Sequence, residues 1–214
     1  MAGLEAQMKS TVILGNGNFP QHSIPLKILK EASAIFCTDG AADALIQQLG
    51  IVPTAIVGDL DSVSEETKDL YPQLLWHFPD QATNDLQKTV QFAKSLGCSD
   101  LVVLGIFGGR EDHAIANFSL LWKLNAEVPL VAYSDFGTFS FVHGKTRLRS
   151  YPGQQVSIFA RDGNCRISCS ELKWPLSDHQ FTEFWQGTLN EATSSELNFR
   201  TEEASALIFQ TYLV

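Results

Sequence analysis

The chain has 214 residues, of which 44% are hydrophobic and 18% are charged, and its formal net charge is −9. This composition is typical of a folded globular protein and excludes a disordered chain. The acidic balance argues against nucleic acid or a membrane surface as a partner, because both repel a negatively charged protein. No apolar stretch approaches the roughly 20 residues that cross a bilayer, and residues 1–10 lack the pattern of a signal peptide, so we expect a cytoplasmic protein.

The four cysteines give no sign of a metal site or a disulfide framework. There is no C-x-x-C pair, and no histidine stands at zinc-finger spacing from the last two cysteines. We therefore predict four reduced thiols with structural roles at Cys37, Cys98, Cys165 and Cys169.

Strand-like and helix-like segments alternate along the first two thirds of the chain. Apolar runs typical of buried strands occupy residues 11–14, 34–37, 55–57, 75–78, 101–107 and 128–133. Helical patterns follow most of these runs, and the last one, which extends to Leu124, is apolar nearly all round and is expected to be well buried. This alternation predicts an α/β fold in which helices cover both faces of a Rossmann-like parallel sheet.

The central motif is Gly58-Asp59-Leu60-Asp61-Ser62, directly after the apolar run 55–57. If that run is a strand, side chains two apart share a face, so Asp59 and Asp61 point the same way from its carboxyl end, a plausible site for magnesium and phosphate. The alternative is a turn whose aspartates cap backbone amides. Ser62 with Glu65 three residues later has the spacing of a capping box, which predicts a helix start there.

Other polar groups also follow predicted strands, and so are expected at the same edge of the sheet. Asp39 follows the second strand, although it could instead cap the next helix. Asp85 stands in the first turn of a predicted helix with Lys88 one turn later, where an anion also suits the helix dipole.

The fifth strand leads into Gly108-Gly109-Arg110, in which the glycines allow close approach of a ligand and the arginine suits a phosphate group. His113 and Asn117 lie one turn apart on the following helix. A lone histidine is more often structural than catalytic, so its role is left open.

The pattern changes near residue 136. Helical periodicity disappears, and short strand-like runs at 137–142, 155–160 and 206–210 are separated by turns rich in glycine and proline. We therefore predict an α/β domain at residues 1–136 and an all-β sandwich domain at residues 137–214.

Six short blocks stand out when they are taken in chain order. In the first domain they are residues 39–43 (DGAAD), 58–62 (GDLDS), 80–88 (DQATNDLQK) and 108–117 (GGREDHAIAN). In the second domain they are residues 172–176 (LKWPL) and 187–191 (GTLNE). In this order the blocks resemble those of the thiamine pyrophosphokinase family. The resemblance covers nearly the whole chain and implies an ATP-binding α/β domain, a thiamine-binding β domain and a homodimer.

The resemblance also implies an activity and a set of site residues. The family transfers a pyrophosphoryl group from ATP to thiamine with Mg²⁺, giving thiamine diphosphate and AMP. Carried over, the metal ligands are Asp59, Asp61 and Asp85, which together with Lys88 form the catalytic group. The residues expected to contact the nucleotide are Asp39, Gly40, Gly58, Gln81, Thr83, Gly108, Gly109, Arg110, Asp112 and His113. Thiamine is expected on Trp174, stacked across the dimer interface, and near Asn190.

Two residues depart from the family pattern, both on the acceptor side. Glu171 stands where the family often has glycine, and Leu189 stands where a serine commonly precedes Asn-Glu. A pyrophosphokinase for another primary alcohol, such as a hydroxymethyl pterin, and a non-catalytic nucleotide sensor therefore stay as alternatives. A nicotinamide oxidoreductase is weaker, because its glycine fingerprint is absent.

Overall fold

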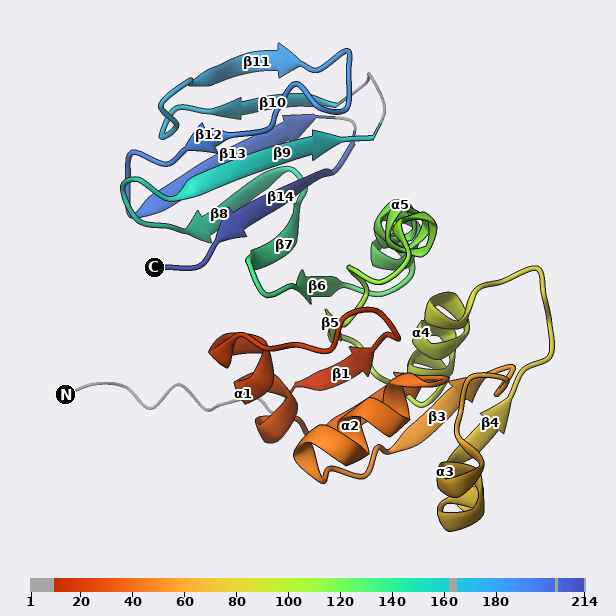
Figure 1. Cartoon of the computed structure of the whole chain (residues 1–214). Helices are drawn as coiled ribbons and strands as arrows, with labels where there is room; N and C mark the ends of the chain where they lie inside the picture. The colour runs from red at the N-terminus through yellow and green to blue at the C-terminus, as the bar shows by residue number, and fades with distance from the viewer. Residues whose placement is uncertain (1–9, 162–164, 203, 214) are drawn as a thin grey trace. The chain divides into compact units, whose positions relative to one another are not determined.

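The computed structural model describes residues 10–161, 165–202 and 204–213 (Figure 1). Residues 1–9, on which the expectation about a signal peptide largely rests, lie outside this part of the chain. The chain divides into two compact units, Met1–Asp135 and Phe136–Val214. Among the helices of the described residues, none has the length and apolar character needed to pass through a membrane.

The first unit is built on a parallel sheet. Its strands are β1 (Thr11–Leu14), β2 (Ala34–Thr38), β3 (Ala55–Gly58), β4 (Leu75–His77), β5 (Leu101–Leu104) and β6 (Leu130–Tyr133). They lie in the order β6-β5-β1-β2-β3-β4, and every adjacent pair is parallel. The direction of strand succession reverses between β1 and β5, which is the point where open α/β sheets bind ligands.

The helices connect these strands, as the alternating pattern predicts. They are α1 (Ser23–Glu31), α2 (Ala41–Leu49), α3 (Glu65–Leu70), a 3-10 turn η1 (Pro72–Leu74), α4 (Asp85–Ser95) and α5 (Glu111–Glu127). Helix α2 ends at Gly50, whose φ of 64° is in the left-handed region that glycine adopts at helix ends. Asn84 begins α4 by accepting a hydrogen bond from the Gln87 backbone N–H.

Side chains of the parallel strands point alternately to two helical layers. Val12 and Leu14 of β1 belong to a buried cluster with Leu29 of α1 and Leu45 of α2. On β2, Phe36 packs instead edge-on against Phe92 of α4, with ring centroids 6.0 Å apart. Since successive residues of a strand face opposite sides, these contacts show helices on both faces of the sheet.

Two local predictions for the helices are wrong. Helix α3 begins after Ser64, whose hydroxyl accepts the Thr67 N–H, and the backbone N–H of Ser62 is held instead by a carboxylate of Asp39. Helix α5 is not buried all round, because only Leu121 and Leu124 of its residues are buried and Ile115 is 70% exposed.

The second unit is antiparallel, which confirms the predicted all-β character. Its strands are β7 (Gly137–Val142), β8 (Lys145–Arg149), β9 (Gln155–Ala160), β10 (Arg166–Cys169), β11 (Leu176–Gln180), β12 (Asn190–Glu191), β13 (Glu196–Glu202) and β14 (Ala206–Thr211). They form two groups of hydrogen-bonded neighbours, β12-β9-β14-β7 and β11-β10-β13-β8.

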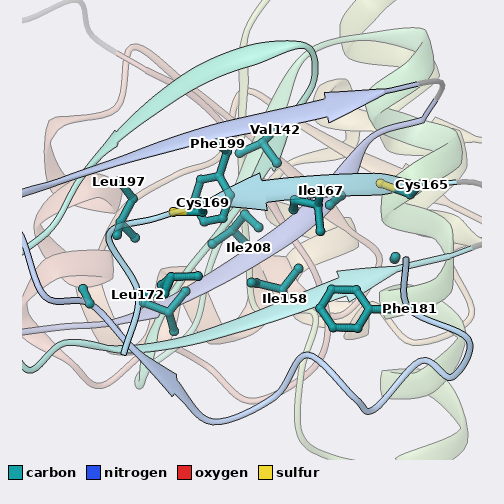
Figure 2. Close-up of a cluster of buried hydrophobic side chains, with 14 residues drawn as sticks. Val142, Ile158, Cys165, Ile167, Cys169, Leu172, Phe181, Leu197, Phe199 and Ile208 are labelled. Carbon is teal, nitrogen blue, oxygen red and sulfur yellow. The ribbon is translucent and has the colours of Figure 1, made fainter. Parts of the chain in front are cut away.

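The two groups of strands enclose one apolar core (Figure 2). Ile158 of β9 and Ile208 of β14 meet Ile167 of β10 and Phe199 of β13 in a single buried cluster. Along β13 the buried residues alternate with exposed ones, as expected for a strand with one face on the core. Cys165 and Cys169 also lie in this cluster, and all four cysteines of the chain are free thiols, as predicted.

Candidate active site

A cleft of about 350 Å³ lies within the first unit, where loops follow the carboxyl ends of the strands. Its walls come from the loops after β1, β2, β3 and β5 and from the N-terminal parts of α4 and α5. The lining residues are Gly15, Asn16, Gly17, Thr38, Asp39, Ser62, Asn84, Asp85, Leu86, Ile106, Gly108, Arg110, His113 and Asn117. The cleft therefore includes the reversal point between β1 and β5.

Close backbone packing fixes the two loops at this reversal point. The Gly17 N–H donates to the Gly105 carbonyl at 2.6 Å, and a Cβ on Gly17 would lie 2.5 Å from the Phe107 oxygen. Gly108 has φ 74° and lies against the side chain of Asn18, which accepts the Gly109 N–H at 3.0 Å. Only glycine fits at Gly17 and Gly108, because the Phe107 oxygen and the Asn18 side chain fill the space that a Cβ would take.

Three carboxylates converge at the carboxyl edge of the sheet. Asp39 follows β2, Asp59 follows β3 and Asp85 begins α4. Each offers an oxygen, and these oxygens all lie within 4.8 Å of one another. Parallel neighbouring strands bring Asp39 and Asp59 together because their carboxyl ends meet at one edge.

Gly58 makes room for this group. A Cβ at Gly58 would lie 3.2 Å from an oxygen of Asp39 and 3.2 Å from an oxygen of Asp85. Any side chain would therefore push against two of the three carboxylates. The family resemblance assigned Gly58 to nucleotide contact, and its observed neighbours are the acids.

Asp39 is the most buried of the three, at 3% exposure. One of its oxygens accepts the Ser62 N–H at 3.0 Å, and within the described residues the other oxygen is buried without a hydrogen-bond partner. Burial raises the pKa of Asp39, and the negative charges of Asp85 and Asp59 raise it further. A buried carboxylate oxygen without a partner, facing two other carboxylates, is the donor set that a hard divalent cation prefers, so the residues fit Mg²⁺.

Asp61 lies outside the group of three. Strand β3 ends at Gly58 and Leu60 has φ 65°, so the chain turns and the shared-face geometry expected for Asp59 and Asp61 does not form. The Asp61 N–H donates to the Asp59 carboxylate at 3.2 Å, as in the alternative of a turn capped by aspartate. Metal binding by Asp61 stays a prediction.

A buried lysine partly balances the acids. The Lys88 ammonium lies 3.1 Å from Asp85, and its side chain is only 5% exposed. Gln81 reaches Asp59 at 3.5 Å from the loop before α4, and the Thr83 hydroxyl donates to Asp80 at 2.7 Å in the same loop. Gly40 is the N-cap of α2 and has no room for a side chain, since a Cβ would lie 2.9 Å from the Ser62 oxygen.

The loop after β5 supplies the cationic wall. Arg110 and His113 line the cleft, and the Arg110 guanidinium makes two hydrogen bonds to Asp112, at 2.6 and 3.1 Å. The Arg110 side chain lowers the pKa of Asp112, and Asp112 in turn accepts the His113 N–H. Asp112 thus contacts its neighbours rather than lining the cleft, and Gly109 is exposed beside it.

Two cleft asparagines were not predicted as site residues. Asn84 donates to Asn117 at 3.2 Å, and Asn117 donates to the Ile106 carbonyl at 3.2 Å, which links α4, α5 and the end of β5. The sequence carried a signal for both: Asn84 directly precedes Asp85, and Asn117 lies one turn after His113. Asn16, Thr38 and Ser62 also line the cleft, next to motifs that were recognised.

In the second unit, Trp174 and Asn190 are directly connected. Asn190 accepts the Trp174 N–H at 3.2 Å and donates to the Trp174 carbonyl at 2.9 Å. The Trp174 side chain stays 57% exposed, with the Lys173 ammonium 5.2 Å from its ring centroid. Asn190 is buried and its amide holds the backbone of an exposed aromatic residue.

Two family profiles match the chain, one in each unit. The profile of the thiamin pyrophosphokinase catalytic domain matches residues 26–132, and that of the thiamin pyrophosphokinase substrate-binding domain matches residues 137–209. Thiamin pyrophosphokinase 1 of Caenorhabditis elegans is 31% identical over 103 residues, which are 44% of this chain and 42% of the nematode protein. Thiamine pyrophosphokinase 1 of rice (Oryza sativa subsp. japonica) is 28% identical over 155 residues, or 61% of this chain and 58% of the rice protein. The chain thus matches about half the length of these two relatives.

Solved structures show the same fold. The thiamine pyrophosphokinase of Bacillus subtilis superposes with a TM-score of 0.81 at 19% identity, covering 96% of this chain and all of that one. The thiamin pyrophosphokinase of Candida albicans gives a TM-score of 0.79 at 15% identity, covering 95% of this chain and 89% of that one.

A parallel sheet with clustered carboxylates and a glycine-lined cleft at its switch point is typical of α/β proteins that bind phosphorylated ligands through a divalent cation. Within that class, the two profile matches, one after the other along the chain, identify the family. The chain belongs to the thiamin pyrophosphokinase family.

Proposed function

We propose that this protein is a thiamine pyrophosphokinase that transfers a pyrophosphoryl group from ATP to thiamine. The observation that carries the proposal is the carboxylate group Asp39, Asp59 and Asp85, of which Asp39 and Asp85 line a cleft at the switch point of the sheet. The proposal covers the reaction, the two substrates, the metal ion and the homodimer.

The first unit is proposed to bind ATP as a Rossmann-like sheet does, with the phosphates at the switch point. Gly17 and Gly108 line the cleft and offer backbone groups to a phosphate, and Arg110 and His113 offer hydrogen-bond donors beside them. Because the chain is acidic overall, a polyphosphate needs the positive charge of Arg110 and a bound metal ion to enter the cleft.

Asp39, Asp59 and Asp85 would hold Mg²⁺, with Asp61 as a further predicted ligand. When bound, Mg²⁺ neutralises phosphate charge and orients the polyphosphate for attack. Lys88, held at 3.1 Å from Asp85, limits the repulsion among the three acids and keeps the group compact before any ligand arrives.

In the proposed reaction the hydroxyl oxygen of thiamine bonds to the β-phosphorus of ATP. The bond from that phosphorus to the bridging oxygen of the α-phosphate breaks, AMP leaves with the bonding electron pair, and the hydroxyl proton is released. Catalysis of such a transfer comes from positioning and from charge stabilisation, which Lys88 and Arg110 can supply. His113 and Asp61 are both candidates for accepting the proton, and we assign it to neither.

The second unit is proposed to bind thiamine and to form the homodimer. Trp174 is an exposed aromatic face, and such a face attracts the cationic thiazolium ring with about 1–2 kcal/mol. Asn190 is placed to fix Trp174 through its backbone. A cytoplasmic location also stays a prediction.

A pterin alcohol is worth testing as an alternative acceptor because of one residue, Leu189. It is 73% exposed, has φ 61° and stands where the family commonly has serine, next to Asn190. The experiment compares thiamine with 6-hydroxymethyl pterins as acceptors, with AMP release as the readout. Turnover with thiamine supports the proposal, turnover with the pterin alone replaces the acceptor, and ATP binding without turnover on either supports the sensor.

A further inference from the structure

The loop that carries Asp59 is held by two carboxylates from one short segment. Asp39 and Asp43 are four residues apart around the start of α2. Asp39 accepts the Ser62 N–H at 3.0 Å, and Asp43 accepts the Ser64 N–H at 2.9 Å. The carboxylates of Asp39 and Asp43 thus accept hydrogen bonds from two alternate backbone amides in the loop between β3 and α3.

Asp43 makes more contacts to the loop than Asp39 does. Its carboxylate also accepts the Ser64 hydroxyl at 2.7 Å and the Thr67 hydroxyl at 2.5 Å. Ser64 in turn caps α3 by accepting the Thr67 N–H at 3.2 Å. Asp43 therefore fixes both the end of the loop and the first turn of the helix that follows.

Asp43 does not line the cleft, whereas Asp39 does. Burial raises the pKa of Asp43, but the hydrogen bonds from Ser64 and Thr67 outweigh this effect and leave its pKa below the usual range. Within the described residues, Asp43 is thus a charged acceptor that takes its hydrogen bonds from the loop and from α3 rather than from the cleft.

The loop needs such anchoring because its conformation is unfavourable. Leu60 has φ 65°, a region that leucine rarely adopts, and the Ser62 oxygen lies close to Gly40, where a Cβ would be only 2.9 Å away. A conformation of this kind persists only where the surrounding contacts determine it.

We propose that Asp43 is a positioning residue that holds the Asp59 loop in the geometry in which the cleft carboxylates bind a divalent cation. The inference rests on the proposed function, since it assigns no ligand beyond that cation. Groups that orient metal ligands commonly change metal affinity by about 10-fold or more when removed.

The test measures the affinity of the full chain for Mn²⁺ by titration, followed through the electron paramagnetic resonance signal of the free ion. Asp43→Ala removes the carboxylate that accepts from Ser64 and Thr67, and is expected to weaken Mn²⁺ binding about 10-fold. Asp43→Asn keeps part of the acceptor capacity, so its affinity for Mn²⁺ should lie between those of the wild type and Asp43→Ala. Asp69→Ala is the matched control, because it removes an exposed acid from α3 and should leave the affinity unchanged.

A folded Asp43→Ala variant with the affinity of the wild type would overturn the inference. If that variant does not fold, Asp43→Asn and Ser64→Ala decide instead: wild-type affinity in both would equally overturn it. Failure of the wild-type chain itself to bind Mn²⁺ would contradict the proposed function, so the two failures are distinguishable.

Discussion

Gly58 shows how much of the site depends on one absent side chain. The nearest atoms to a Cβ added at this position would be carboxylate oxygens of Asp39 and Asp85, both at 3.2 Å. Strand β3 ends at Gly58 and so fixes the position of Asp59. The missing side chain at Gly58 leaves room for the carboxylates of Asp39 and Asp85 next to that of Asp59. The acids and this glycine therefore act as one group.

We expect Gly58→Ala to fold and to bind the metal poorly. Its added methyl group presses on two flexible carboxylates, which can yield slightly, so the cost in stability is about 1 kcal/mol. Displacing two ligands of one cation should raise the Mg²⁺ concentration for half-maximal activity by roughly 10-fold. A variant with unchanged Mg²⁺ dependence would show that the three acids do not act together.

Single residues also show which features of the site could not be predicted from the sequence. Parallel strands made it predictable that acids after different strands would meet, and Asp59 and Asp85 do meet. The residue that joins them is Asp39, which was predicted to contact the nucleotide, whereas Asp61 follows Leu60 with its positive φ and lies outside the group. A positive φ at a leucine has no signal in the sequence, so the shared face of Asp59 and Asp61 was the natural but incorrect geometry.

At the scale of elements, the connection between α2 and α3 depends on the ionised form of Asp43. Its pKa is lowered in the folded chain, so its contribution to stability is present above the unfolded pKa and is lost as the pH falls through the folded pKa. This contribution is about 1 kcal/mol, the usual value for a partly exposed charged hydrogen bond.

We therefore expect the wild type to lose more stability than Asp43→Asn as the pH falls from about 7 to below about 4. Urea unfolding followed by circular dichroism at several pH values measures the difference. Parallel curves for the two proteins across this range would show that Asp43 carries no stabilising charge.

In the second unit, apolar strands were easier to predict from the sequence than strands with many charged residues. Continuous apolar runs predicted β7, β9 and β14, whereas β8, β10, β11, β12 and β13 were missed. In β8 the sequence Lys-Thr-Arg-Leu-Arg places charged residues at alternate positions, and in β13 only every second residue is buried. In β8, β10 and β13 more buried residues alternate with less buried ones, so period-two alternation was the available signal there, whereas β11 has no buried residue and carries no such signal.

At the scale of the molecule, we propose that ATP binds to the first unit and thiamine to the second, in a homodimer. The family resemblance implies that Trp174 of one protomer serves the cleft of the other. Variants that damage opposite sides of such a shared site should complement one another.

Asp85→Asn and Trp174→Ala should each be nearly inactive alone. After unfolding and refolding together they should regain about a quarter of wild-type activity, because half of the dimers are mixed and one of two sites in each is intact. Mixing without any gain, while sedimentation shows dimers, would mean that each site belongs to a single protomer.

The most direct test of the proposed activity follows the group that is transferred. The protein is incubated with Mg²⁺, thiamine and ATP carrying radioactive phosphorus at the β position, and the products are separated by chromatography. We predict labelled thiamine diphosphate and unlabelled AMP in equal amounts, both lost in Asp85→Asn. Labelled ADP with thiamine monophosphate, or bound ATP with no product from a folded protein, would contradict the proposed transfer.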